Sequence, residues 1–183
     1  MSKWIRVFTV AACVAALPGP AFATTAVRLS NEAMAVGADV IAIGTAIDVQ
    51  TVWEGRTLVT RVTLKVNDRL KGDVGSTVDV ALPGGIDANR RIPISMVYAG
   101  APHIALGEEV FVFLSRDEGV QGGLTVLGFS QGKFSIGRDA DGRAIVTRDL
   151  SAVALDTGVG ITPGSVSVTT LNEFRAEIAG YLR

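Results

Sequence analysis

The chain is poor in the residues that build metal and disulfide sites. Its 183 residues include one cysteine, Cys13, and one histidine, His103. A lone cysteine excludes an intrachain disulfide, and a lone histidine has no partners at the spacing of a zinc site. We therefore expect no metal and no cofactor. Stability must come from packing, in a chain long enough for one hydrophobic core.

Charged and aromatic residues are also few. The chain has 17 Lys and Arg against 18 Asp and Glu, a formal net charge of −1, and its aromatic content is 6%. Proteins that bind single-stranded nucleic acid combine a basic groove with stacking aromatic side chains. We therefore expect no nucleic-acid partner.

Residues 1–23 are predicted to be a secretory signal peptide. Lys3 and Arg6 form a basic start, an apolar run follows over 7–17, and Ala21-Phe22-Ala23 fits the small-residue cleavage site before Thr24. The apolar run is too short to span a bilayer, and no later segment is long enough. We expect a secreted or periplasmic protein without a transmembrane segment.

Cys13 offers an alternative interpretation of the same segment. The sequence Val10-Ala11-Ala12-Cys13 loosely resembles the lipobox at which bacterial lipoproteins are cleaved and acylated. The apolar run before Cys13 is too short, and the residues after it stay apolar. We therefore expect cleavage after Ala23 and no lipid anchor.

The strongest structural pattern lies over 38–72. Apolar and polar residues alternate there on both sides of a Trp-Glu-Gly-Arg turn, which predicts a long two-stranded ribbon with one core face and one solvent face. The side chains expected on the core face are Ile41, Ile43, Ile47 and Val49 of the first strand and Leu58, Val62, Leu64 and Val66 of the second.

Shorter strand patterns follow the ribbon. The segment 109–115 lacks polar alternation, so we expect it to be covered on both faces, and Asp139-Ala140-Asp141-Gly142 predicts a hairpin turn. The remaining strands are predicted over 77–82, 91–97, 124–129, 133–138 and 144–148, whereas the Gly-rich segment 151–167 is weakly patterned and predicts a connection.

Two helices are predicted at the ends of the processed chain. Ser30 is a suitable N-cap for a helix over about 30–36, which Gly37 ends. Thr170 and Glu173 form a capping box for a helix over about 170–183, with one apolar side made of Leu171, Phe174, Ile178 and Leu182. Because no repeat or linker divides residues 24–183, we expect one mainly β domain.

The order of these elements also resembles a known family. A short helix precedes Ala38-Asp39-Val40-Ile41 and Gly44-Thr45, the second strand ends in Leu70-Lys71-Gly72, and LGEEVFVFL follows over 106–114. This order, over roughly 29–136, resembles small exported bacterial domains similar to the inhibitory domain of tissue inhibitors of metalloproteinases. The resemblance implies a single OB-like antiparallel β-barrel and an exported metalloprotease as partner.

One departure from that family concerns mechanism. Its animal members chelate the protease zinc through an N-terminal cysteine, whereas Thr24-Thr25-Ala26 offers no thiol. That mechanism does not carry over to this chain.

Candidate binding residues lie at the ribbon turn and in the long loop over 83–107. Trp and Arg dominate contact hot spots, and long loops on rigid scaffolds often carry binding residues. Trp53 has a second interpretation, as a lid over the barrel mouth. His103 also has one, as a surface-loop or structurally hydrogen-bonded imidazole. The candidate set is Trp53, Arg56, Arg90, Arg91, Tyr98 and His103.

The sequence Gly128-Phe129-Ser130-Gln131-Gly132 matches the G-x-S-x-G motif of α/β-hydrolases, which requires a helix after the serine. An alternating, strand-like pattern follows instead. The order His103, Asp117, Ser130 runs as in chymotrypsin-type enzymes, but only 27 positions separate the first of these residues from the last. We interpret the two glycines as marks of a tight turn with Ser130 at its tip.

The expected function is therefore that of an exported, non-catalytic binding module for another protein, not an enzyme. Two alternatives stay open: a serine hydrolase that uses Ser130, and a structural envelope protein without a specific ligand.

Overall fold

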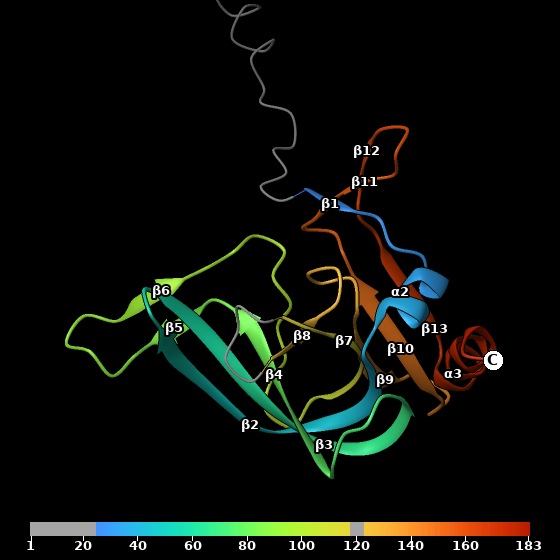
Figure 1. Cartoon of the computed structure of the whole chain (residues 1–183), viewed down its shortest axis with the longest axis horizontal. Helices are drawn as coiled ribbons and strands as arrows, with labels where there is room; N and C mark the ends of the chain where they lie inside the picture. Colours follow the sequence, from blue (N-terminus) through green and yellow to red (C-terminus); the bar gives the residue numbers. More distant parts are fainter. Residues whose placement is uncertain (1–24, 118–122) are drawn as a thin grey trace, which may run out of the picture.

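A computed structural model describes residues 25–117 and 123–183, which contain thirteen strands and two helices (Figure 1). The mainly β character predicted from the sequence is confirmed. The predicted signal peptide, its cleavage site and Cys13 lie outside the described residues. Neither helix in the described part of the chain is long and apolar enough to cross a membrane.

The elements follow one another in this order: β1 (Thr25–Val27), α2 (Asn31–Gly37), β2 (Val40–Glu54), β3 (Thr57–Lys71), β4 (Thr77–Pro83), β5 (Gly85–Asp87), β6 (Ile94–Met96), β7 (Glu109–Arg116), β8 (Leu124–Val126), β9 (Lys133–Arg138), β10 (Ala144–Asp149), β11 (Ala154–Asp156), β12 (Ile161–Pro163), β13 (Val166–Thr170) and α3 (Leu171–Tyr181).

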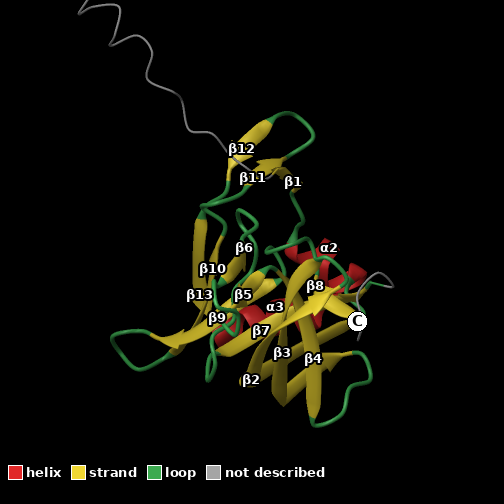
Figure 2. Ribbon diagram, turned by 90° about the vertical axis from the view of Figure 1, so that its left-hand side faces the viewer, coloured by secondary structure: helices red, strands yellow, loops and turns green. Residues whose placement is uncertain are grey.

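Eight strands form one large sheet in the order β13-β10-β9-β7-β2-β3-β4-β8 (Figure 2). β8 also pairs with β7, so it has a neighbour on each side. Two smaller sheets accompany the large one: β1 lies parallel to β11, which pairs with β12, and β5 pairs with β6.

The predicted ribbon is confirmed as β2 and β3, but the predicted faces of β2 are wrong. Ile41 and Ile43 pack on the side of the helices, Val49 packs on the opposite side, and Ile47 is 49% exposed. The pairing of β2 with β3 shifts register at three places, between Ile41 and Ala42, Ile43 and Gly44, and Ala46 and Asp48. Such irregularities insert a residue and reverse the alternation. The face prediction for β3 holds, since Val62, Leu64 and Val66 share one core and Leu58 is buried.

The sheet has a core on each face. The first, here called the inner core, lies between the ribbon and strands β4, β7 and β8. The second, the helix-side core, lies under α2 and α3. Successive residues of β7 alternate between them: Val110, Val112 and Leu114 join the inner core, whereas Phe111 and Phe113 join the helix-side core. The prediction that this strand is covered on both faces is confirmed.

Both predicted helices are present, with shifted ends. The Ser30 hydroxyl accepts a 3.0 Å hydrogen bond from Ala33 N, and α2 ends at Gly37. The Thr170 hydroxyl accepts one of 3.3 Å from Glu173 N, but α3 ends at Tyr181, short of the predicted 183. α3 buries Phe174, whose ring centre lies 4.5 Å from that of Phe134.

Other boundaries differ from the prediction. β1 was not predicted, and the segment 151–167 contains β11, β12 and the start of β13 rather than an unstructured connection. The strand predicted over 124–129 ends at Val126, and that over 91–97 shrinks to β6. The parallel pairing of β1 with β11 joins residues far apart in sequence, so no local sequence pattern predicts it.

Candidate functional site

The site begins with the hairpin of β5 and β6, which packs against the far end of the ribbon (Figure 1). Gly84 N donates a 3.0 Å hydrogen bond to Leu58 O, and Leu58 N donates one of 3.2 Å to the sulfur of Met96. Gly85 lies so close to the ribbon that a Cβ there would approach Thr51 and Thr60 side-chain atoms to 2.6–2.7 Å. Only glycine therefore allows this contact.

Trp53, Asp87 and Arg90 form a cluster at this junction. Asp87 Oδ2 accepts hydrogen bonds from Trp53 Nε1 at 2.8 Å and from Arg90 Nε at 2.9 Å. The guanidinium carbon of Arg90 lies 5.1 Å from the centre of the Trp53 ring, a cation–π contact. The hydrogen bond from Trp53, followed by that from Arg90, lowers the pKa of the Asp87 carboxyl. The cluster fixes the hairpin on the ribbon.

Large apolar side chains of the hairpin and the following loop face solvent. Ile92 is 77% exposed and Val97 is 86% exposed, and Ile86 is also exposed. Exposed apolar side chains that gather on one hairpin and its loops, rather than being scattered singly over the surface, are a feature of interaction sites. We call the set Trp53, Ile86, Asp87, Arg90, Ile92, Val97 and Tyr98 the ribbon-end surface.

Two cavities flank Tyr98 beside this surface. The smaller, of about 200 Å³, is lined by Tyr98, Met96 and His103, and the larger, of about 670 Å³, by Tyr98, Val59 and Phe129. The ring of Tyr98 and the neighbouring Pro102 border both. Cavities of this size next to exposed apolar residues can receive side chains of a partner.

The structure brings some of the predicted site residues together. Trp53 contacts Arg90, and Tyr98 and His103 line the same cavity. Arg56 is exposed at the ribbon turn, and Arg91 is exposed between β5 and β6. Asp87 and the three exposed aliphatic residues Ile86, Ile92 and Val97 were not among the residues predicted from the sequence. The sequence signal for these aliphatic residues as part of the site was their position in the loop on either side of Arg90 and Arg91.

A polar cavity of about 380 Å³ contains an ion pair. Lys133 Nζ lies 2.6 Å from Glu108 Oε1, and both contact the Ser135 hydroxyl. Burial raises the pKa of Glu108, but hydrogen bonds from Lys133, the Ala105 amide and Ser135 together have the larger opposite effect. The pKa of Glu108 is therefore lowered from its ordinary value. Lys133 Nζ donates hydrogen bonds to both the Glu108 carboxylate and the Ser135 hydroxyl, so it acts as a donor toward Ser135 rather than as a base that activates it.

Ser130 also lines the polar cavity, together with His103. It lies in the predicted turn but is buried, and its Oγ has no hydrogen-bond partner within the described residues. The turn itself is present, and strand β9 follows it where a nucleophile elbow has a helix. Asp117 lines the larger cavity beside Tyr98 instead.

In the described residues, no three His, Cys, Asp or Glu side chains are placed to hold a metal ion. Comparison of the chain with protein-family models and with curated proteins returns no match.

Proposed function

We propose that the chain is an exported, non-catalytic binding module whose ribbon-end surface contacts another protein. The observation that carries this proposal is the exposure of Ile86, Ile92 and Val97 on a hairpin that the Asp87 cluster fixes in place. Apolar side chains beside an arginine and an aromatic ring are typical of contact hot spots. A fixed backbone lowers the entropic cost of binding.

The proposal includes an OB-like barrel as the scaffold. Support comes from the strand pairings: β2 pairs with β3 and β7, β3 with β4, and β8 with both β4 and β7. The contact of β8 with β4 is parallel and the others are antiparallel. Five strands therefore follow one another in a circuit around the inner core, and the ribbon end projects from it.

The partner that we propose is an exported metalloprotease, on the basis of the family resemblance. Thr25 belongs to β1, which pairs with β11 away from the ribbon end (Figure 1). The contact would thus use the ribbon-end surface, with no thiol at the N-terminus.

The test is binding to the zinc proteases secreted by the source cells. Purified protein is titrated against each isolated protease, with calorimetry for affinity and a fluorogenic peptide for activity. We expect Ile92→Asp and Val97→Asp each to weaken binding at least tenfold, because a carboxylate is desolvated at the contact. The matched control is Val159→Asp, since Val159 is 98% exposed between β11 and β12.

Equal losses in all three variants, or no binding by the wild type, would contradict the proposal. Absence of any protein partner would instead favour the structural envelope role.

A serine hydrolase is the second candidate. The observation in its favour is the buried, unpartnered Oγ of Ser130 in the cavity that His103 also lines. A fluorophosphonate probe tests it directly: labelling of the wild type that Ser130→Ala abolishes would establish this function in place of the first.

A further inference from the structure

Two arginines, Arg28 and Arg148, line one small cavity at the other end of the molecule, beside β1 and β10 (Figure 1). Its volume is about 60 Å³. No carboxylate of the described residues forms an ion pair with either arginine. The cavity is further lined by side chains that carry no charge, among them Leu150, Leu155, Thr162, Ser165 and Ser167.

The Arg148 guanidinium is mostly buried without the partners it needs. Its carbon lies 4.9 Å from the centre of the Phe134 ring, and its Nε is buried with no hydrogen-bond partner. Nη1 reaches the Gln131 carbonyl only at 3.5 Å. Burial, and then the charge of Arg28, lower the pKa of Arg148. A buried unpaired cation is costly unless an anion neutralises it.

Arg28 is exposed, but its backbone is fixed on both sides by the buried side chain of Gln131. Gln131 Nε2 donates a 2.8 Å hydrogen bond to Val27 O, and its Oε1 accepts one of 2.8 Å from Leu29 N. Arg28 N itself donates to Asp156 O at 2.9 Å. The second arginine is therefore held near the first before any ligand arrives.

We propose that this cavity binds a tetrahedral oxyanion, the phosphate or sulfate group of a free ion or of a small monoester. A guanidinium offers a planar fork of N–H donors that matches such oxygens. The volume is several times the ~10–15 Å³ that a cavity needs to hold one water, which leaves room for one such group. The anion would supply the negative charge that pairs with the guanidinium groups of Arg28 and Arg148.

An adjoining cavity of about 530 Å³ shares both arginines and provides space for the rest of a monoester. It is also lined by Glu32 and Glu177, and Glu177 Oε1 accepts hydrogen bonds from Asn31 Nδ2 at 2.9 Å and Tyr181 OH at 3.2 Å. These carboxylates repel a second anion and suit hydroxyl or amine groups. The oxyanion is thus expected in the smaller cavity.

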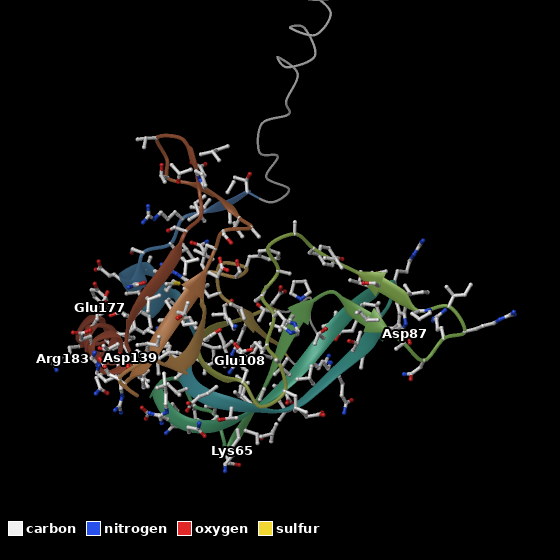
Figure 3. The ribbon with its side chains drawn as sticks, turned by 180° about the vertical axis from the view of Figure 1, so that it is seen from behind. Lys65, Asp87, Glu108, Asp139, Glu177 and Arg183 are labelled. Atoms are coloured by element: carbon white, nitrogen blue, oxygen red, sulfur yellow. The ribbon has the colours of Figure 1, made fainter. Side chains whose placement is uncertain are left out.

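The experiment is calorimetric titration of the purified protein with inorganic phosphate, glycerol 3-phosphate and chloride at equal ionic strength. We expect both phosphates to bind, with an affinity reduced about tenfold in Arg28→Ala, which removes an exposed side chain and should fold normally. Arg148→Lys keeps the buried charge but loses the fork, so it should also weaken binding. Lys65→Gln is the control, because exposed Lys65 lies on the opposite side of the molecule from β1 and β11 (Figure 3).

Tighter binding of glycerol 3-phosphate than of phosphate identifies a monoester as the source, and the reverse order identifies the free ion. Chloride that binds as well as phosphate overturns the proposal. So does an affinity that Arg28→Ala leaves unchanged, or that Lys65→Gln lowers equally.

Discussion

The Trp53 indole donates a 2.8 Å hydrogen bond from Nε1 to Asp87 Oδ2, and this contact connects the end of β2 to the hairpin that follows β4. The two residues lie 34 positions apart. The same carboxylate oxygen accepts a hydrogen bond from Arg90 Nε, so one charged group holds both the aromatic and the basic member of the ribbon-end surface.

Acid should release this junction. Because the pKa of Asp87 is lowered in the folded protein, its contribution to stability is present above the ordinary aspartate pKa of about 3.9 and is lost as pH falls through the lower folded value. Trp4 lies in the predicted signal peptide, so we expect Trp53 to be the only indole of the processed chain. We expect its fluorescence to change with a midpoint below pH 3.9 and to lose that transition in Asp87→Asn. A midpoint above 3.9 would contradict the assignment.

The Glu108–Lys133 pair should support stability at neutral pH. Lys133→Met leaves a half-buried carboxylate without its cation, and we expect the free energy of unfolding to fall by about 2 kcal/mol. The pKa of Glu108 is lowered in the wild type, so the loss should shrink as pH falls below about 4.3 and the carboxylate is protonated. Urea unfolding of the wild type and the variant at pH 7 and pH 4 measures the loss of stability and its dependence on pH. The exposed pair Arg69–Asp73 provides the control, since Arg69→Met should cost less than ~1 kcal/mol.

Local signals account for what the sequence predicts well. The Asp139–Gly142 turn and both N-caps each depend on residues a few positions apart, and the ribbon pairs two strands that follow one another directly in sequence. The exposure of Ile47 depends instead on pairing partners: β2 pairs with both β3 and β7 from Ile41 to Thr45 and with β3 alone from Asp48 onward. A register shift falls between these two regions, and alternation alone cannot place it.

The residues of the candidate site likewise fall into those that the sequence predicts and those that only the folded structure brings together. Trp53 and Arg90 were identified by residue type, whereas Asp87 becomes part of the site only because the hairpin folds back on the ribbon. Arg28 and Arg148 likewise meet across 120 positions of sequence, and their meeting depends on the unpredicted pairing of β1 with β11.

Phe174 should hold α3 on the sheet. Its ring lies 5.0 Å from Phe111 and 4.5 Å from Phe134 between ring centres, and the residue is 2% exposed. Phe174→Ala removes this contact and leaves a cavity, so we expect a loss of about 3–4 kcal/mol in the free energy of unfolding. Tyr181→Ala truncates an exposed aromatic residue of the same helix and should cost less than ~1 kcal/mol. Comparable losses in the two variants would show that Phe174 does not anchor the helix.

The glycines of the Gly128–Gly132 turn should matter for folding rather than for chemistry. A Cβ on Gly132 would lie 2.8 Å from Phe113 O and 2.9 Å from Leu127 O, both fixed backbone atoms. Gly132→Ala therefore forces β7 and the turn apart, and we expect it to cost about 2 kcal/mol. Gly137, on β9, has open space around it, so Gly137→Ala should be neutral or slightly stabilising. Thermal unfolding of both variants gives the comparison, and equal stabilities would show that the turn tolerates the added methyl group.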